Sequence, residues 1–202
     1  MATSNKHQPA PGHKAVYLNG RLVGEVREGH DHTEDAELAR QLMIEKGLYK
    51  KVSVEQAMFN QAMAFAATSS MLYYQKLAHL PRDGQAITPW VVNTAFSIEV
   101  YLKTVGRLFG VNTRGHKLLR IFEQLPDEAK SLILKAVGPA ATFWKVEETV
   151  DVVRTLSVLN DAFVQWRYHY EVGDLNEIFI MPAIVVATAL HEVCREELKG
   201  RE

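Results

Sequence analysis

The chain contains 202 residues, enough for one domain, or for one domain with a small appendage, that buries most of its apolar surface. Lysine and arginine number 23 against 24 aspartates and glutamates, so the net charge of -1 creates no global field that favours nucleic acid or membranes. The single cysteine, Cys194, excludes an intramolecular disulfide and is typical of a reducing compartment. The most apolar stretch, residues 179–190, contains Pro182 and is too short to span a bilayer. We therefore expect a cytoplasmic protein with no membrane partner.

The first fifty residues predict a small unit that contains the only strands. Residues 1–13 are rich in Pro, Ser, Asn and His and lack the apolar core of a signal peptide, so we expect a disordered leader. Asn19-Gly20 separates two short apolar runs and predicts a β-hairpin over about residues 14–27. Asp31 and Glu34 form a capping pair for a helix that ends near Lys46. Residues 14–50 are thus expected to form a ββα appendage.

Helical periodicity begins after this appendage. Ser53 is the expected cap of a helix that ends before Pro81. Thr88 as a cap and Pro89 in the first turn predict a second helix that continues to Phe109, with apolar residues at alternating steps of four and three.

The second half of the chain predicts further helices. Short helices are expected over residues 116–125 and 127–137, with Gly138-Pro139 ending the second. The longest amphipathic helix is expected over about residues 146–170, and Pro182 is expected to begin the last helix. The predicted fold class is therefore mainly α: an up-and-down bundle of four to five helices over residues 51–202, with a small hairpin and helix before it.

Common signatures of enzymes and metal sites are missing from the sequence. The segment His191-Glu192-Val193-Cys194-Arg195 has an arginine where the zinc-protease pattern needs its second histidine. The His30-Asp31-His32 segment is interpreted as a polar loop that leads into a helix cap. We expect no metal and no cofactor.

One segment of this neutral chain is locally basic. Residues 103–120, here called the basic segment, contain no acidic residue. Its cationic side chains are Lys103, Arg107, Arg114, Lys117 and Arg120, together with His116. Two interpretations stay open: a solvated helix face on which Glu99 pairs with Lys103 one turn away, or a surface that contacts phosphate groups of RNA or a nucleotide.

A second polar group is expected near the end of the longest helix. Helical spacing places Asn160, Arg167 and Glu171 along one stripe beside the apolar face. This stripe is either an Arg-Glu pair that clamps two helices or part of a ligand site.

Three motifs follow one another along the predicted bundle. They are Asn93-Thr94-Ala95-Phe96-Ser97-Ile98-Glu99-Val100-Tyr101-Leu102-Lys103, then Gly115-His116-Lys117-Leu118-Leu119, then Trp166-Arg167-Tyr168. Their order resembles the higher eukaryotes and prokaryotes nucleotide-binding (HEPN) superfamily, over about residues 53–199. The resemblance implies a helical bundle that usually dimerises and has a cleft at the dimer interface.

Many members of this superfamily are metal-independent ribonucleases of toxin–antitoxin or phage-defence systems. They use an arginine followed four to six residues later by a histidine. Here the candidate arginine is Arg167, and the nearest histidine, His169, follows after two residues. Two helical steps rotate a side chain by about 200°, so this pair departs from the family pattern.

Three functions follow from this resemblance. The leading one is a homodimer that binds a nucleotide or RNA through Arg167 and the basic segment, without chemistry of its own. The second is an active ribonuclease in which Arg167 stabilises the transition state and His169 or His116 transfers protons. The third is an antitoxin-like subunit that binds a protein encoded nearby. The dimer is also expected from aromatic residues outside the apolar stripes, which are Phe96, Tyr101, Phe143, Trp144 and Phe179.

Overall fold

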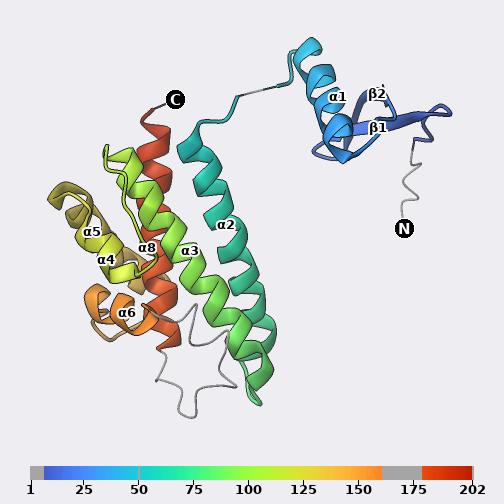
Figure 1. Ribbon diagram of the computed structural model, residues 1–202. Helices are drawn as coiled ribbons and strands as arrows, with labels where there is room; N and C mark the ends of the chain where they lie inside the picture. Colours follow the sequence, from blue (N-terminus) through green and yellow to red (C-terminus); the bar gives the residue numbers. More distant parts are fainter. Residues whose placement is uncertain (1–6, 50, 161–178, 202) are drawn as a thin grey trace. The chain divides into compact units, whose positions relative to one another are not determined.

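A computed structural model describes residues 7–49, 51–160 and 179–201 of the chain (Figure 1). The described residues are mainly helical and contain one two-stranded antiparallel sheet, as predicted. The chain divides into two compact units, Met1–Val52 and Ser53–Glu202.

The first unit consists of a hairpin and one helix. Strands β1 (His13–Leu18) and β2 (Arg21–Arg27) pair antiparallel, with a register shift between Val16 and Tyr17. The predicted Asn19-Gly20 turn is confirmed, because both residues have the positive φ angles, 51° and 76°, that a tight hairpin turn of this kind requires. The amide of Ala10 donates to Glu25 at 3.0 Å, which ties part of the expected leader to the hairpin.

Helix α1 (His32–Glu45) follows the hairpin and begins at the predicted cap. The Asp31 carboxylate accepts hydrogen bonds from the amides of Thr33 and Glu34, both at 2.8 Å. Lys14 of β1 donates to Asp35 of this helix at 2.6 Å. Val16 is the one buried apolar side chain among the described residues of this unit. A small core and several ion pairs thus hold the unit together.

The second unit begins with two long helices. Helix α2 (Val54–Leu72) starts at Ser53, whose hydroxyl accepts from the amide of Gln56 as predicted, and continues into a π-helical turn, η1 (Tyr73–Leu77). A short 3-10 turn, η2 (Gly84–Ala86), leads directly into α3 (Ile87–Leu108). The predicted Thr88 cap is wrong, because α3 begins at Ile87, one residue before Thr88. The side-chain cap is instead the Asp83 carboxylate, which accepts from the amide of Gln85 in the preceding turn.

The remaining helices are α4 (Leu118–Glu123), α5 (Asp127–Phe143), α6 (Val152–Leu159) and α8 (Ile180–Lys199). Two predicted boundaries are wrong. Helix α5 continues through Gly138-Pro139, because the helix still presents a buried side chain, Ala140, to the core beyond the proline. Helix α6 begins at Val152 rather than near residue 146, because Lys145 has a positive φ of 55° and the Asp151 carboxylate caps the amide of Arg154.

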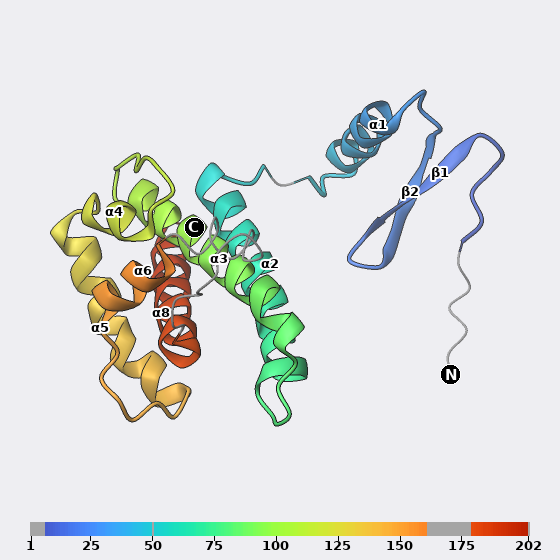
Figure 2. The same cartoon turned by 60° about the horizontal axis from the view of Figure 1, so that its bottom comes forward.

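Helices α3 and α8 form the centre of this unit. Both views show α2 on one side of this pair and α4, α5 and α6 on the other (Figures 1 and 2). Phe59 and Phe65 of α2 contact Tyr101 and Phe96 of α3 respectively, so these two helices run antiparallel. Helix α8 runs parallel to α3, because Tyr101 meets His191 and, farther along both helices, Arg201 donates to the carbonyl of Leu108.

Candidate functional site

The basic segment covers the end of α3, a loop and the beginning of helix α4. The loop lies close against α3 at Gly106, where an added Cβ would lie 2.8 Å from Cγ2 of Thr113. The amide of Val111 also donates to the carbonyl of Gly106 at 2.8 Å. This contact fixes where the loop returns along α3 and brings His116 back to the helix.

A buried carboxylate joins the loop to the helix. Glu99 of α3 is only 7% exposed, and its Oε1 atom accepts from Nζ of Lys103 at 2.7 Å and bonds Nδ1 of His116 at 2.9 Å. Glu99, Lys103 and His116 are here called the Glu99 cluster. A buried carboxylate needs such partners. Removing an unpaired charge from water costs on the order of several kcal/mol, even after the surrounding protein has relaxed.

The geometry of this cluster determines which nitrogen of the His116 ring carries the proton in the bond to Glu99. An ionised carboxylate can only accept, so the proton of the hydrogen bond to Glu99 lies on Nδ1. The His116 side chain is 86% exposed. In the neutral ring, Nε2 is therefore an acceptor, and the ring's exposure lets it bond a ligand.

The other basic side chains of the segment are dispersed. Arg107 lies at the α2 side and pairs with Glu55 at 3.1 Å, and Arg120 pairs with Glu123 at 3.2 Å. Lys117 is exposed and occupies the cap position before α4. Arg114 is exposed, and its backbone amide and carbonyl are both bonded by the side chain of Gln124. None of the ion pairs among the described residues involves Arg114.

Asn160 is the one member of the predicted polar stripe that lies in the described part of the chain. It ends helix α6, and its Oδ1 accepts from the amide of Leu119 at 3.2 Å. This bond satisfies a free amide in the first turn of α4, two residues after Lys117. Asn160 therefore positions the end of the loop that carries His116. The predicted site residues Arg167, His169 and Glu171 lie outside the described residues.

The His116–Glu99 bond is the feature that sequence reasoning missed. Spacing by four residues predicted the Glu99–Lys103 pair, which is confirmed. The contact between Glu99 and His116 crosses seventeen residues and has no helical spacing to indicate it. The available signal was the position of Glu99 itself, which stands among the buried residues Ile98, Val100 and Tyr101 and therefore needs a polar partner.

The described ranges contain neither a metal-binding cluster nor a membrane-spanning helix. No group of three or more His, Cys, Asp or Glu side chains there is arranged to hold a metal ion. No helix in the same ranges has both the length and the apolar character that crossing a bilayer demands.

Comparisons of the chain with protein-family models, with curated proteins and with solved structures found no match.

Proposed function

We propose that this chain is a HEPN-like homodimer that binds RNA or a nucleotide through phosphate contacts at the Glu99 cluster and the loop beside it. The observation that carries this proposal is the arrangement around Glu99. One buried carboxylate orients an ammonium group and an exposed imidazole, and the adjoining loop adds the exposed cations Arg114 and Lys117.

The charge at this place suits a phosphate ligand. The Glu99 carboxylate offsets the charge of Lys103, and the loop adds the positive charges of Arg114 and Lys117. Each cation that contacts phosphate contributes to affinity through release of counterions. Because Glu99 fixes Lys103 and His116 before binding, less conformational entropy is lost when a ligand binds.

The resemblance to the HEPN superfamily supports the remaining parts of the proposal. It suggests a toxin–antitoxin or phage-defence setting, with Arg167 as a further phosphate contact. In this setting an antitoxin-like role, as partner of a protein encoded nearby, is the alternative to nucleic-acid binding. Stable co-purification with one protein, and no RNA affinity, would favour that alternative.

A salt titration tests the binding proposal. Fluorescence anisotropy of a labelled single-stranded RNA, and in parallel of a labelled ATP, is measured over a range of salt concentrations. Arg114→Ala and Lys117→Ala should each weaken binding and reduce the slope of log K against log salt by roughly 0.7 for single strands. Lys135→Ala, which removes an exposed cation on α5, is the matched control and should leave the slope unchanged. Equal effects of all three variants would contradict a defined site.

One observation also favours the ribonuclease function. A histidine that is oriented by a carboxylate through Nδ1 and exposes Nε2 has the arrangement of a general base. In this reaction Nε2 of His116 takes the proton of an RNA 2′-hydroxyl while that oxygen attacks phosphorus. The bond between phosphorus and the 5′-oxygen then breaks, the 5′-oxygen takes a proton from water, and a 2′,3′-cyclic phosphate remains.

This second function has its own test. Labelled RNA is incubated with the protein in EDTA, and the products are examined for a cyclic phosphate. If the protein cleaves RNA, His116→Gln should lower the cleavage rate by about 10²- to 10⁴-fold and should affect RNA binding less. Cleavage that persists in His116→Gln and is lost in His169→Ala would assign the proton transfer to His169 instead.

A further inference from the structure

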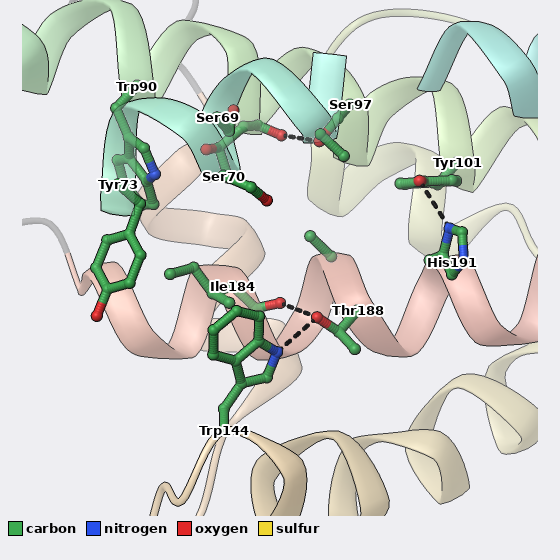
Figure 3. A pocket seen from close by; sticks show the side chains of 13 residues that line it. Ser69, Ser70, Tyr73, Trp90, Ser97, Tyr101, Trp144, Ile184, Thr188 and His191 are labelled. Atoms are coloured by element: carbon green, nitrogen blue, oxygen red, sulfur yellow. Dashed lines mark hydrogen bonds between the residues drawn. The ribbon is translucent and has the colours of Figure 1, made fainter. Parts of the chain in front are cut away.

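A pocket separate from the Glu99 cluster lies between α2, α3 and α8, with Trp144 at its lower edge (Figure 3). Its volume is about 140 Å³. The residues that matter for its chemistry are Ser69, Tyr73, Trp90, Thr94, Trp144 and His191. Ser70, which is exposed, also lines it, so the pocket reaches the surface of this unit.

Three polar groups of this pocket are buried without a hydrogen-bond partner in the part of the chain that the structure describes. They are the Ser69 hydroxyl, the Trp90 indole N–H and the Thr94 hydroxyl. These residues are 6%, 0% and 3% exposed, respectively. Buried polar groups are nearly always hydrogen-bonded, because their desolvation is otherwise not offset. Three such groups around one pocket therefore indicate a polar atom that belongs there.

Other polar groups of the same pocket are already engaged. The Ser97 hydroxyl donates to the carbonyl of Thr94 at 2.8 Å. The Trp144 indole N–H donates to the Thr188 hydroxyl at 2.9 Å, and that hydroxyl donates to the carbonyl of Ile184. These groups are therefore used by the fold, whereas the three groups named above are available to a ligand.

The described residues of the lining carry no formal charge at neutral pH. No Asp, Glu, Lys or Arg is among them. Burial lowers the pKa of His191, which keeps its imidazole neutral, and burial raises the pKa of Tyr101, which keeps its phenol protonated. An ionic ligand would lose its hydration without gaining a counter-charge, so the ligand should be neutral.

Size and wall chemistry define the ligand further. An engineered apolar cavity of about 150 Å³ holds benzene, so this pocket has room for one six-membered ring. Tyr73, Trp90 and Trp144 supply aromatic walls. The Trp90 indole can only donate, whereas the two hydroxyls can donate or accept. We propose that this pocket binds a small neutral aromatic molecule with one hydroxyl or carbonyl group, which accepts from Trp90 and bonds Thr94 and Ser69.

Calorimetric titration of the full chain with three probes tests this proposal. Phenol has the required ring and polar group, benzene has only the ring, and benzoate has a charge. Phenol should bind with a dissociation constant several-fold below that of benzene, and benzoate should not bind. Thr94→Val, which keeps the shape and removes the hydroxyl, should weaken phenol about fivefold or more and leave benzene unchanged.

Two further variants keep the test decisive. Ser97→Ala is the matched control, because its hydroxyl is already bonded to the backbone, and it should leave phenol binding unchanged. Ala187→Leu, which fills the pocket, should abolish binding of phenol and benzene together. Failure of phenol to bind would overturn the proposal and leave ordered water as the partner of the three groups. Equal binding of phenol and benzene, insensitive to Thr94→Val, would reduce the site to an apolar cavity and also overturn it.

Discussion

Glu99 shows how one side chain can hold a loop in place. Its carboxylate lies in the apolar centre of α3 and is shared by Lys103 and His116. Sequence reasoning reached the first partner because helical spacing is regular. It did not reach the second, because the path of the loop depends on the approach of Thr113 to Gly106, which no local pattern encodes. The candidate site was therefore predictable where it follows a helix and unpredictable where it follows a loop.

Arg167 is the residue on which the two interpretations of the polar stripe differ, and it lies outside the described residues. If it contacts phosphate, as we expect, Arg167→Ala should weaken RNA or nucleotide binding and reduce the salt slope by roughly one unit, with little change in stability. If it is a structural clamp to Glu171, the same change should lower the free energy of unfolding by about 1 to 3 kcal/mol and leave binding intact. Binding titrations and urea denaturation distinguish the two outcomes.

His169→Ala completes this experiment. We expect no catalytic effect, as for a degenerate nuclease motif. Metal-independent RNA cleavage that is lost in both Arg167→Ala and His169→Ala would overturn this expectation and establish a ribonuclease.

His191 should make stability depend on pH. Burial among Phe59 and Tyr101 lowers its pKa below the ordinary 6.5. Below about pH 6.5 the unfolded chain therefore binds more protons than the folded protein, and stability falls as the pH falls. In thermal unfolding between pH 7.5 and 5, His191→Gln should flatten this decline. His79→Gln, at an exposed histidine, is the control, and an identical decline in all three proteins would contradict the assignment.

At the scale of elements, regular patterns predicted most helices and failed at three boundaries, the starts of α3 and α6 and the end of α5. The hairpin turn, the Asp31 cap and the Ser53 cap are local devices, and the structure confirms them. Gly138-Pro139 was expected to end α5, yet Ala140 beyond it packs into the core. Tertiary packing there outweighs the loss of one backbone hydrogen bond at the proline. The end of α5 depends on packing against residues far away in the sequence, so it could not be predicted from the residues next to it.

Gly106 leaves no room for a side chain where α3 meets the loop that follows it. Gly106→Ala should place a methyl group 2.8 Å from Thr113 and push the loop away from α3, which lowers the free energy of unfolding by about 1 to 3 kcal/mol. The same variant should weaken phosphate binding, because His116 is carried by this loop. Gly138→Ala in α5 is the matched control, since its added methyl meets no atom within 4 Å. That change should instead stabilise by roughly 0.5 to 1 kcal/mol, measured by urea denaturation.

At the scale of the whole molecule, the homodimer remains a prediction, and several aromatic side chains expected at its interface are covered within the chain. Tyr101 was expected outside the apolar stripes but is buried in the core. Phe96 is half-buried against Phe65, and Arg154 covers Phe179. Phe143 keeps an exposed ring, 74% accessible, in contact with Trp144.

Phe143 therefore offers the sharpest test of the dimer. Sedimentation at micromolar concentration should show a species of twice the 22.8 kDa chain mass. Phe143→Ser should shift that species toward the monomer, because a large apolar ring at an interface loses its burial. Leu134→Ser, at another exposed apolar side chain of α5, is the comparison. A purely monomeric wild-type protein would refute the dimer.

The central place of α3 has a consequence for how this unit opens. Its interior residues, Ile98, Leu102 and Val105 among them, are fully buried, and α2, α4 and α8 all pack against it. Its backbone amides can meet solvent deuterium only when those neighbours separate, so they should exchange at the rate of global unfolding. The amides of the short helix α4 should exchange earlier. Thr94 and Glu99 both belong to α3, so the anchor residues of both proposed sites lie in the slowest-exchanging part of the chain.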